Sequence, residues 1–245
     1  MLIDTHFHLD LMENMESLIR GFQTSEIGII AVGTTPKAYM RETHFCTGVR
    51  SIKVGLGLHP QLVEEREQEI ELFLRLMDGC RYIGEIGLDF NSASVVSKEK
   101  QLSFFRRIVK VCADEGDKVL SVHSVKAVAA MIDALENAGA FRNNICILHW
   151  FIGTAAERRR AIENDAWFSI NPRMLRTKTG QEMIKAIPLN RMLLETDSPF
   201  TMKVGSVEVL SEELDKLVAG ISAIRGENVK KQIQENSAQL VWGRL

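Results

Sequence analysis

A regular alternation of two patterns is the feature of this chain that most constrains its fold. Eight short apolar runs, rich in β-branched residues, have the length and composition of buried parallel strands. These predicted strands cover residues 2–5, 27–33, 52–58, 82–88, 119–122, 145–148, 167–170 and 192–194. Stretches of helical period lie between or after them, most clearly at residues 62–77, 98–115, 125–137, 155–164, 179–187, 208–224 and 228–241.

Repeated strand–helix units predict a parallel sheet that is covered by helices. Eight units favour a (β/α)8 barrel over an open doubly wound sheet, and a length of 245 residues suits one barrel. No Pro/Gly-rich linker or charge block divides the chain. We therefore expect a single (β/α)8-barrel domain over residues 1–245.

Histidines mark the ends of the predicted strands. Five of the six histidines follow an apolar run at its downstream end, namely His6, His8, His59, His123 and His149. The sixth, His44, lies in or at the end of a predicted helix and receives no role. In a barrel, active-site residues gather at the C-terminal ends of the strands. We therefore expect the five strand-end histidines to share one mouth.

Acidic and amide residues follow the same pattern. Glu85 lies inside the fourth run, where a buried carboxylate is costly unless it is paired or binds a metal. Asp89 follows that run, Asn171 follows the seventh and Asp197 follows the eighth. Asp197 is followed by Ser-Pro, so it could instead form a turn or cap a helix.

The first motif, IDTHFHLD, places His6 and His8 on alternate positions, which face the same side of a strand. An isolated pair of this kind is more often a coincidence than a metal site. Combined with the other strand-end histidines, Glu85 and Asp197, the pair predicts a metal centre whose ligands come from distant parts of the chain.

The bulk composition excludes several classes of protein. A net charge of −2 gives no basic footprint for tight binding of a long duplex. The four cysteines are far apart and form no CxxC pair, which favours free, mostly buried thiols in a reducing cytoplasm. No apolar run is long enough to span a membrane, and the first residues lack the features of a signal peptide. We expect a cytoplasmic protein that does not bind membranes.

The motifs, taken together, resemble the TatD family of the amidohydrolase superfamily. The resemblance extends over nearly the whole chain through IDTHFHLD, GLGLHP, IGEIGLDF, VHS, LHWFIGT, LLETDSPF and the late ENSAQLVWG, which contains Asn236. Members of this family are metal-dependent hydrolases with a (β/α)8 barrel, and many are deoxyribonucleases. The resemblance therefore implies an enzyme with two divalent ions per chain, and the sequence leaves Mg, Mn and Zn open.

The resemblance also implies a role for each matching residue. His6 and His8 would bind one metal, His123 and His149 the other, and Glu85 would bridge them. Asp197 would complete the first metal's ligands and stand beside the attacking water, as the expected general base. The implied catalytic residues are Asp197 and Glu85, and His59 looks like a substrate-phosphate contact.

Three acids near these ligands, Asp4, Asp10 and Glu195, have two interpretations of equal weight. They could orient the imidazoles from behind, or they could cap and stabilise the rim.

The chain departs from the family's pattern at positions next to the predicted metal centre. Val125 and Lys126 follow Ser124, where an Arg-Asp or similar polar pair is common. Ile152 stands where the family usually has Ser or Thr, and no Arg- and Asn-containing loop is evident after Phe200. These departures affect the expected substrate more than the expected chemistry.

Candidate substrate contacts lie in the loops that follow the strands. Asn171 and Arg173 belong to a locally basic segment, residues 171–178, which would otherwise be a solvated loop and helix start. Further cationic candidates are Lys126, Arg176 and Lys178. Three aromatic residues could stack on a base or pack in the core, namely Phe90, Trp150 and Phe200.

These observations favour a phosphodiester hydrolase, most simply an exonuclease acting on DNA that is single-stranded or bound end-on. A hydrolase of an amide or ester, such as an aminoacyl-tRNA, is the second hypothesis, because a fold does not fix a substrate. A nuclease subunit of a multi-protein defence assembly is the third. In that case residues 207–224 would be a candidate interface, although an ordinary outer barrel helix explains them equally well.

Overall fold

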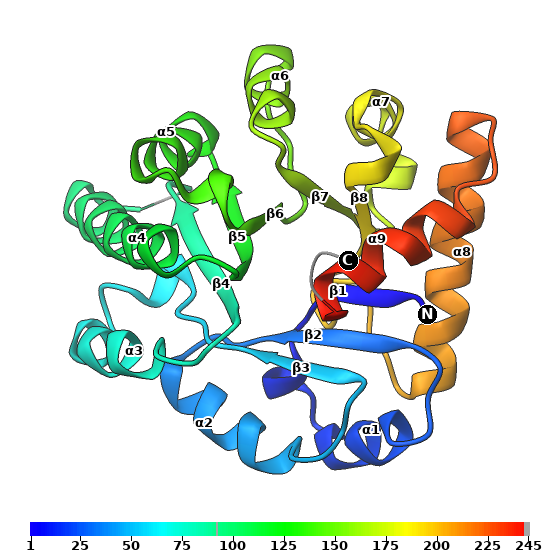
Figure 1. The fold of residues 1–245 in the computed structure, drawn as a ribbon, viewed down its shortest axis with the longest axis horizontal. Helices are drawn as coiled ribbons and strands as arrows, with labels where there is room; N and C mark the ends of the chain where they lie inside the picture. The colour runs from blue at the N-terminus through cyan, green and yellow to red at the C-terminus, as the bar shows by residue number, and fades with distance from the viewer. Residues whose placement is uncertain (92, 243–245) are drawn as a thin grey trace.

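The computed structural model describes residues 1–91 and 93–242. Eight parallel strands form one sheet in the order β3-β2-β1-β8-β7-β6-β5-β4. They are β1 (Ile3–Phe7), β2 (Gly28–Val32), β3 (Ile52–Gly55), β4 (Tyr82–Asp89), β5 (Val119–Val125), β6 (Ile145–Leu148), β7 (Trp167–Ile170) and β8 (Met192–Leu194). Helices surround this sheet in Figure 1.

The two ends of the sheet meet just beyond β3. Leu56 pairs with Ile83 of β4 in a parallel bridge. The Leu56 amide donates to the Tyr82 carbonyl at 3.0 Å, and the Gly84 amide donates to the Leu56 carbonyl at 2.9 Å. The strands therefore close into a barrel, which confirms the predicted (β/α)8 fold.

Nine helices are present in the described residues. They are α1 (Met15–Phe22), α2 (Pro36–Phe45), α3 (Ile70–Leu76), α4 (Val95–Glu115), α5 (Val128–Ala138), α6 (Ala155–Glu163), α7 (Lys178–Ala186), α8 (Val207–Arg225) and α9 (Lys230–Trp242). The helix predicted over residues 62–77 is much shorter than expected, because 3-10 turns occupy residues 60–62 and 67–69. The helix predicted from residue 125 begins at Val128, because β5 continues to Val125.

Polar side chains fix the starts of several helices. Thr35 accepts a hydrogen bond from the Ala38 amide, and Pro36 occupies the first turn of α2, where its missing N–H costs nothing. Thr154 and Glu157 form a reciprocal capping box at the start of α6. These signals place the helices directly after the loops at the C-terminal ends of the strands.

The last helix covers the N-terminal end of the barrel. Leu240 of α9 packs in one apolar cluster with Ile3, Val119 and Trp167, which lie at the starts of their strands. The Tyr82 hydroxyl donates to the Leu240 carbonyl at 3.0 Å. Figure 1 shows α9 over the strands, inside the ring formed by the other helices. The opposite, C-terminal end of the barrel is therefore where a site can open.

Asn236, the residue noted in the late motif, ties α9 to the start of β8. Its amide donates to the carbonyls of Leu189 and Met192 at 2.8 and 2.7 Å. None of the helices in the described ranges has the combination of length and apolarity that a bilayer crossing requires.

Candidate metal centre

The Glu85 carboxylate lies at the centre of the barrel mouth, surrounded by imidazoles. Glu85 lies in β4 and is only 2% exposed. All five strand-end histidines place a ring nitrogen within 4 Å of one of its two oxygens. The prediction that these histidines share one mouth is therefore confirmed.

One oxygen of Glu85 faces the two histidines of the first motif. Oε2 is 3.5 Å from Nε2 of His6 and 3.4 Å from Nε2 of His8. Asp197 closes the same space, because its Oδ1 lies 3.8 Å from His6 Nε2 and 3.5 Å from His8 Nε2. Two imidazoles and two carboxylates thus converge on one position at the mouth, from the ends of β1 and β8 and from β4.

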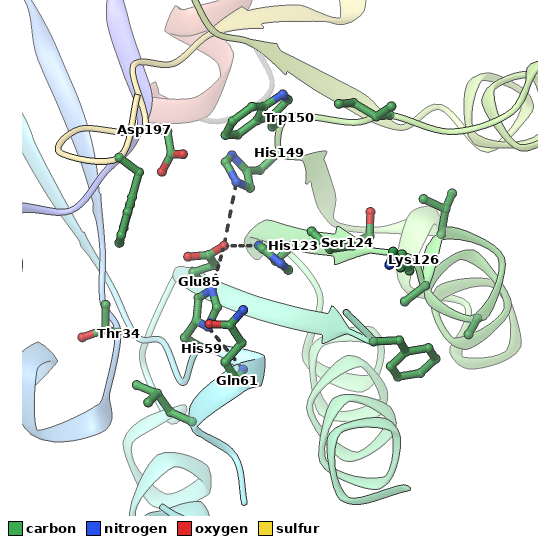
Figure 2. Close-up of a pocket in the computed structure, with 18 of the residues that line it drawn as sticks. Thr34, His59, Gln61, Glu85, His123, Ser124, Lys126, His149, Trp150 and Asp197 are labelled. Carbon is green, nitrogen blue, oxygen red and sulfur yellow. Dashed lines mark hydrogen bonds and ion pairs between the residues drawn. The ribbon is translucent and has the colours of Figure 1, made fainter. Parts of the chain in front are cut away.

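The other oxygen of Glu85 faces the remaining three histidines. His123 Nδ1 donates to Oε1 at 2.7 Å, and the Nε2 atoms of His59 and His149 lie 3.7 and 3.8 Å from the same oxygen. Figure 2 shows these rings converging on Glu85, with Asp197 on the opposite side. The two oxygens of one carboxylate therefore serve two different groups of ligands.

Among the described residues, three groups of ligand atoms lie within 4.8 Å of one another, and they differ in two respects from the predicted ligand sets. His6, His8 and Glu85 form one group, as expected for the first metal. A second group contains His59, Glu85 and His123, so His59 stands where His149 was expected. The third group joins His6 and His149, which were expected on different metals, to Glu195.

Buried side chains hold the histidine rings from behind. Nδ1 of His149 donates to Glu195 Oε2 at 2.9 Å, and Nδ1 of His6 shares a hydrogen bond of 2.8 Å with the Ser121 hydroxyl. Their Nε2 atoms are thereby turned toward Glu85. This is the usual arrangement of metal-binding imidazoles, whose second nitrogen is bonded to a carboxylate or another polar group.

Asp4, Asp10 and Glu195 were expected either to orient the imidazoles or to stabilise the rim, and the structure places them in three different environments. Glu195 orients an imidazole, as described above. Asp10 lies behind His8, with Oδ1 3.9 Å from Nδ1, while its other oxygen accepts from the amide and hydroxyl of Thr34 at 2.9 and 2.5 Å.

Asp4 contacts no imidazole and instead joins the backbone of β1 to the loop after β8. Its carboxylate accepts from the amides of His6 and Thr196, each at 3.1 Å, and from the Thr196 hydroxyl at 2.5 Å. It therefore fixes the strand that carries the first pair of histidines.

Asp89 holds the outer side of His123. Nε2 of His123 donates to Asp89 Oδ2 at 3.3 Å, and the same oxygen accepts from Gln61 at 2.7 Å. Gln101 of α4 accepts from the Asp89 amide at 2.7 Å. A chain of hydrogen bonds thus fixes this ring from the β3 side and from α4.

The stacked rings of His6 and His149 have pKa values that are shifted in opposite directions. The rings of His6 and His149 are nearly parallel, with centroids 3.7 Å apart. Burial, and then the neighbouring His149, lower the pKa of His6 to about 3. Burial also opposes a charge on His149, yet Glu195 above all raises its pKa to about 10. His6 is therefore neutral at physiological pH, while His149 carries a proton that a metal would displace.

Glu85 and His123 form a similar pair. Burial would raise the pKa of Glu85, but the surrounding histidines, His59 and His6 first, hold it well below its usual range. Burial would lower the pKa of His123, but Asp89 and Glu85 raise it to about 9. The central carboxylate is thus ionised and available as a ligand.

These residues fit divalent cations. Nε2 of His6 is buried and has no hydrogen-bond partner among the described residues, although two carboxylate oxygens lie within 4 Å of it. A lone pair that is oriented but unused costs free energy unless a ligand occupies the space before it. Mixed imidazole and carboxylate donors suit Zn, Mn, Co or Fe, and carboxylates also serve Mg.

The backbone bends sharply where three strand ends meet the mouth. Lys126, Trp150 and Asp197 have φ values of 51°, 40° and 52°, in the left-handed region that side chains other than Gly, Asn and Asp rarely adopt. The Asp197 amide donates to the His6 carbonyl at 2.9 Å, which fixes the bend after β8. Strain of this kind concentrates at functional sites.

The predicted substrate residues occupy three different environments. His59 lines the cavity above the metal centre, 3.7 Å from Glu85, and burial lowers its pKa. Asn171 is fully buried outside the cavity and donates to Glu195 Oε1 at 3.0 Å. Arg173 lies outside the cavity, where its guanidinium donates to the Phe200 carbonyl at 2.6 Å.

Arg176 and Lys178 are exposed and are also outside the cavity lining, whereas Lys126 is part of it. All three aromatic candidates, Phe90, Trp150 and Phe200, line the cavity. The cation of Arg173 lies over the Trp150 ring, 5.4 Å from its centroid.

Ser121, Ser169 and Gln61 are supporting residues that the sequence patterns did not reveal. Ser121 lies two positions before His123 in β5, and alternation along a strand is the signal that could have identified it. The Ser169 hydroxyl of β7 donates to Glu195. Gln61 sits in the 3-10 turn after His59, and no local pattern marks it.

Comparisons with known proteins agree with this geometry. Residues 3–241 match the family model described as TatD related DNase. A putative deoxyribonuclease, tatdn3, from Danio rerio is 26% identical over 214 residues, which are 80% of this chain and 79% of that protein. An uncharacterised metal-dependent hydrolase from Haemophilus influenzae is 25% identical over 253 residues, 98% of each chain.

Solved structures show the same fold. A hydrolase TatD family protein from Entamoeba histolytica matches with a TM-score of 0.79 at 18% identity, over 99% of this chain and 98% of that one. At this identity the likeness concerns the fold alone. The resemblance that the motifs indicated is confirmed by the family match.

Proposed function

This chain belongs to the TatD related DNase family, and we propose that it is a two-metal phosphodiesterase that degrades DNA from an end. It is an enzyme, a metal-dependent hydrolase. The observation that carries the proposal is the position of Glu85, whose two oxygens face two separate groups of histidines.

We assign the residues around Glu85 to two ions as the family resemblance implies. His6, His8 and Asp197 would hold one ion, and His123 and His149 the other, with Glu85 contributing an oxygen to each. When bound, such ions lower the pKa of a water molecule and neutralise the charge that develops on the phosphoryl oxygens.

The side chains themselves supply proton transfer and positioning. Asp197 lines the cavity and faces the first group of ligands, so it is the general base that takes the proton of the attacking water. The same carboxyl group can then protonate the leaving oxygen. His59 lines the cavity beside Glu85, where it would contact a phosphoryl oxygen of the substrate. Glu195 and Ser121 hold the His149 and His6 rings in place.

DNA is the proposed substrate because of the family and its named relatives, among them a deoxyribonuclease, TATDN3, from Homo sapiens. Binding of one strand or of an end follows from a net charge of −2, which gives no long basic track for a duplex. All four cysteines are free and buried, which supports a reducing compartment such as the cytoplasm.

The test is a cleavage assay on labelled single-stranded and duplex DNA with Mg, Mn or Zn. Cleavage that is lost both with a chelator and in Glu85→Gln supports the proposal. Glu99→Gln, an exposed carboxylate of α4, is the matched control and should retain full activity. Full metal loading without cleavage of any DNA would contradict the proposal, and turnover of an aminoacyl-tRNA instead would assign ester hydrolysis to this site.

A further inference from the structure

A cavity of about 1190 Å³ opens above the metal centre. Glu85, His123 and Asp197 form one end of it. The rest extends across the end of β5 and the start of α5 to the loop after β6. The cavity is large enough for a substrate of several rings, since sites for small ligands usually have about 300–1,000 Å³.

The cavity wall away from the metal centre is mostly apolar. Its members come from the end of β5, the start of α5 and the two loops beside them, and we call this set the apolar wall. It consists of Phe90, Val125, Ala127, Ala130, Trp150 and Ile152. Figure 2 shows Trp150 beside His149, and it shows His123, Ser124 and Lys126 following one another away from Glu85.

Two side chains of the apolar wall are exposed where they line the cavity. Ile152 is 55% exposed and Val125 is 36% exposed. Large apolar groups that remain exposed inside a concave site are usually covered by a ligand.

Positive charge is scarce in the cavity. Among the described residues that line it, Lys126 is the single one with a permanent positive charge, whereas Glu85, Glu157 and Asp197 are acidic. Arg173 lies outside the lining, where its guanidinium donates to the Phe200 carbonyl and lies over Trp150. It keeps its charge, so the phosphates of a substrate strand would meet one cationic side chain in the cavity and a second one at its rim.

We infer that the apolar wall binds the nucleobase next to the scissile phosphate, so that the enzyme recognises a DNA end through one terminal nucleoside and not through flanking phosphates. This inference rests on the proposed phosphodiesterase function. Every base has an apolar face that can pack on aliphatic and aromatic side chains, and such stacking does not depend on sequence.

Two small phosphodiesters separate base recognition from catalysis. The p-nitrophenyl ester of thymidine 5′-phosphate carries a base, and methyl p-nitrophenyl phosphate has the same leaving group without one. We expect the wild-type enzyme to prefer the thymidine ester in kcat/KM. In Ile152→Ser and in Val125→Ser, the ratio of kcat/KM for the thymidine ester to kcat/KM for the methyl ester should fall roughly 10-fold. This is the usual effect of losing one apolar contact. Val95→Ser changes an exposed apolar residue outside the cavity and should leave the preference unchanged.

Equilibrium binding supplies a readout that does not depend on turnover. Thymidine 5′-monophosphate should bind the metal-loaded protein at least roughly 10-fold more tightly than methyl phosphate, and Ile152→Ser should remove that difference. An octamer of thymidylate should show a shallow dependence of log Kd on log salt, with a slope near −1, because each phosphate contact on a single strand contributes about −0.7.

The outcomes separate this inference from the proposed function. Hydrolysis of both esters with equal kcat/KM, or a slope that reports several phosphate contacts, would overturn base recognition while leaving the phosphodiesterase intact. Failure to hydrolyse either ester would contradict the phosphodiesterase, and the binding comparison would then still decide whether the apolar wall accepts a base.

Discussion

Glu195 and His149 form a buried pair in which the imidazole Nδ1 lies 2.9 Å from the carboxylate Oε2. Ser169 and Asn171 donate to the same carboxylate, so its orientation is fixed from β7 and from the loop that follows. The pair turns Nε2 of His149 toward Glu85. Much of the site's organisation therefore depends on a residue that would not itself touch a metal.

Glu195→Gln should weaken metal binding without changing the fold. Glutamine keeps the shape of the side chain but removes the negative charge that raises the pKa of His149 and strengthens it as a ligand. We expect a loss of about 10- to 100-fold in affinity for one ion, as is usual for such supporting partners. Competition with a fluorescent chelator measures this. Equal affinities in wild type and variant would exclude the orienting role.

Metal binding should release protons. In the metal-free chain the pKa values of His123 and His149 are raised to about 9 and about 10, so both rings are protonated at pH 7.5. A ring nitrogen must lose its proton to bind a metal. Rising pH up to about 10 should therefore tighten metal binding, and acid should weaken it.

Calorimetry in two buffers with different ionisation enthalpies measures this effect directly. We expect roughly one to two protons released per chain at pH 7.5. A heat of binding that is the same in both buffers would show that these rings are already neutral.

Asp197→Asn should lower kcat by about 100-fold or more, because it removes the proposed proton acceptor. The residue has a φ of 52°, and asparagine tolerates this left-handed conformation as well as aspartate does. The substitution therefore tests the carboxylate without disturbing the bend after β8. Circular dichroism provides the control for folding. A variant that keeps wild-type kcat would remove Asp197 from the catalytic residues.

Thr196→Val should destabilise the protein by about 1–3 kcal/mol, the usual effect of leaving a buried polar group unpaired. The Thr196 hydroxyl donates to Asp4 at 2.5 Å, and both residues are fully buried. Urea unfolding of the metal-free protein measures the change. Thr47→Val is the matched control, because the Thr47 hydroxyl donates to the Thr43 carbonyl at the surface. This substitution should change the free energy of unfolding by less than about 0.5 kcal/mol.

The fold was largely predictable because each strand contains or adjoins a short run rich in apolar residues, which local composition reveals. Helix α1 was not predicted, although Leu18, Ile19 and Phe22 form a buried stripe along it. Helix α2 confirms the helix expected at His44, but its start was not predicted, because it buries little more than Pro36 and Glu42. The predicted helix over residues 62–77 was too long because 3-10 turns keep similar spacing between apolar residues.

The site was predictable in its members but not in its arrangement. Strand ends of a barrel meet at one mouth whatever the loops do, so the five histidines and Glu85 could be placed together. The environments of Asn171 and Arg173 depend on how the loops after β6, β7 and β8 bend, including the positive φ of Trp150. No short sequence pattern encodes contacts between three loops, so their pairing with Glu195 and Phe200 was not foreseen.

The two-metal proposal requires one ion beside each oxygen of Glu85. Crystals grown with Mn or Zn, measured on both sides of the metal's absorption edge, locate such ions. We expect two anomalous peaks per chain, one beside each oxygen of Glu85, and the loss of at least one peak in Glu85→Gln. A single peak in the wild type, or peaks away from Glu85, would exclude a two-metal site at this carboxylate.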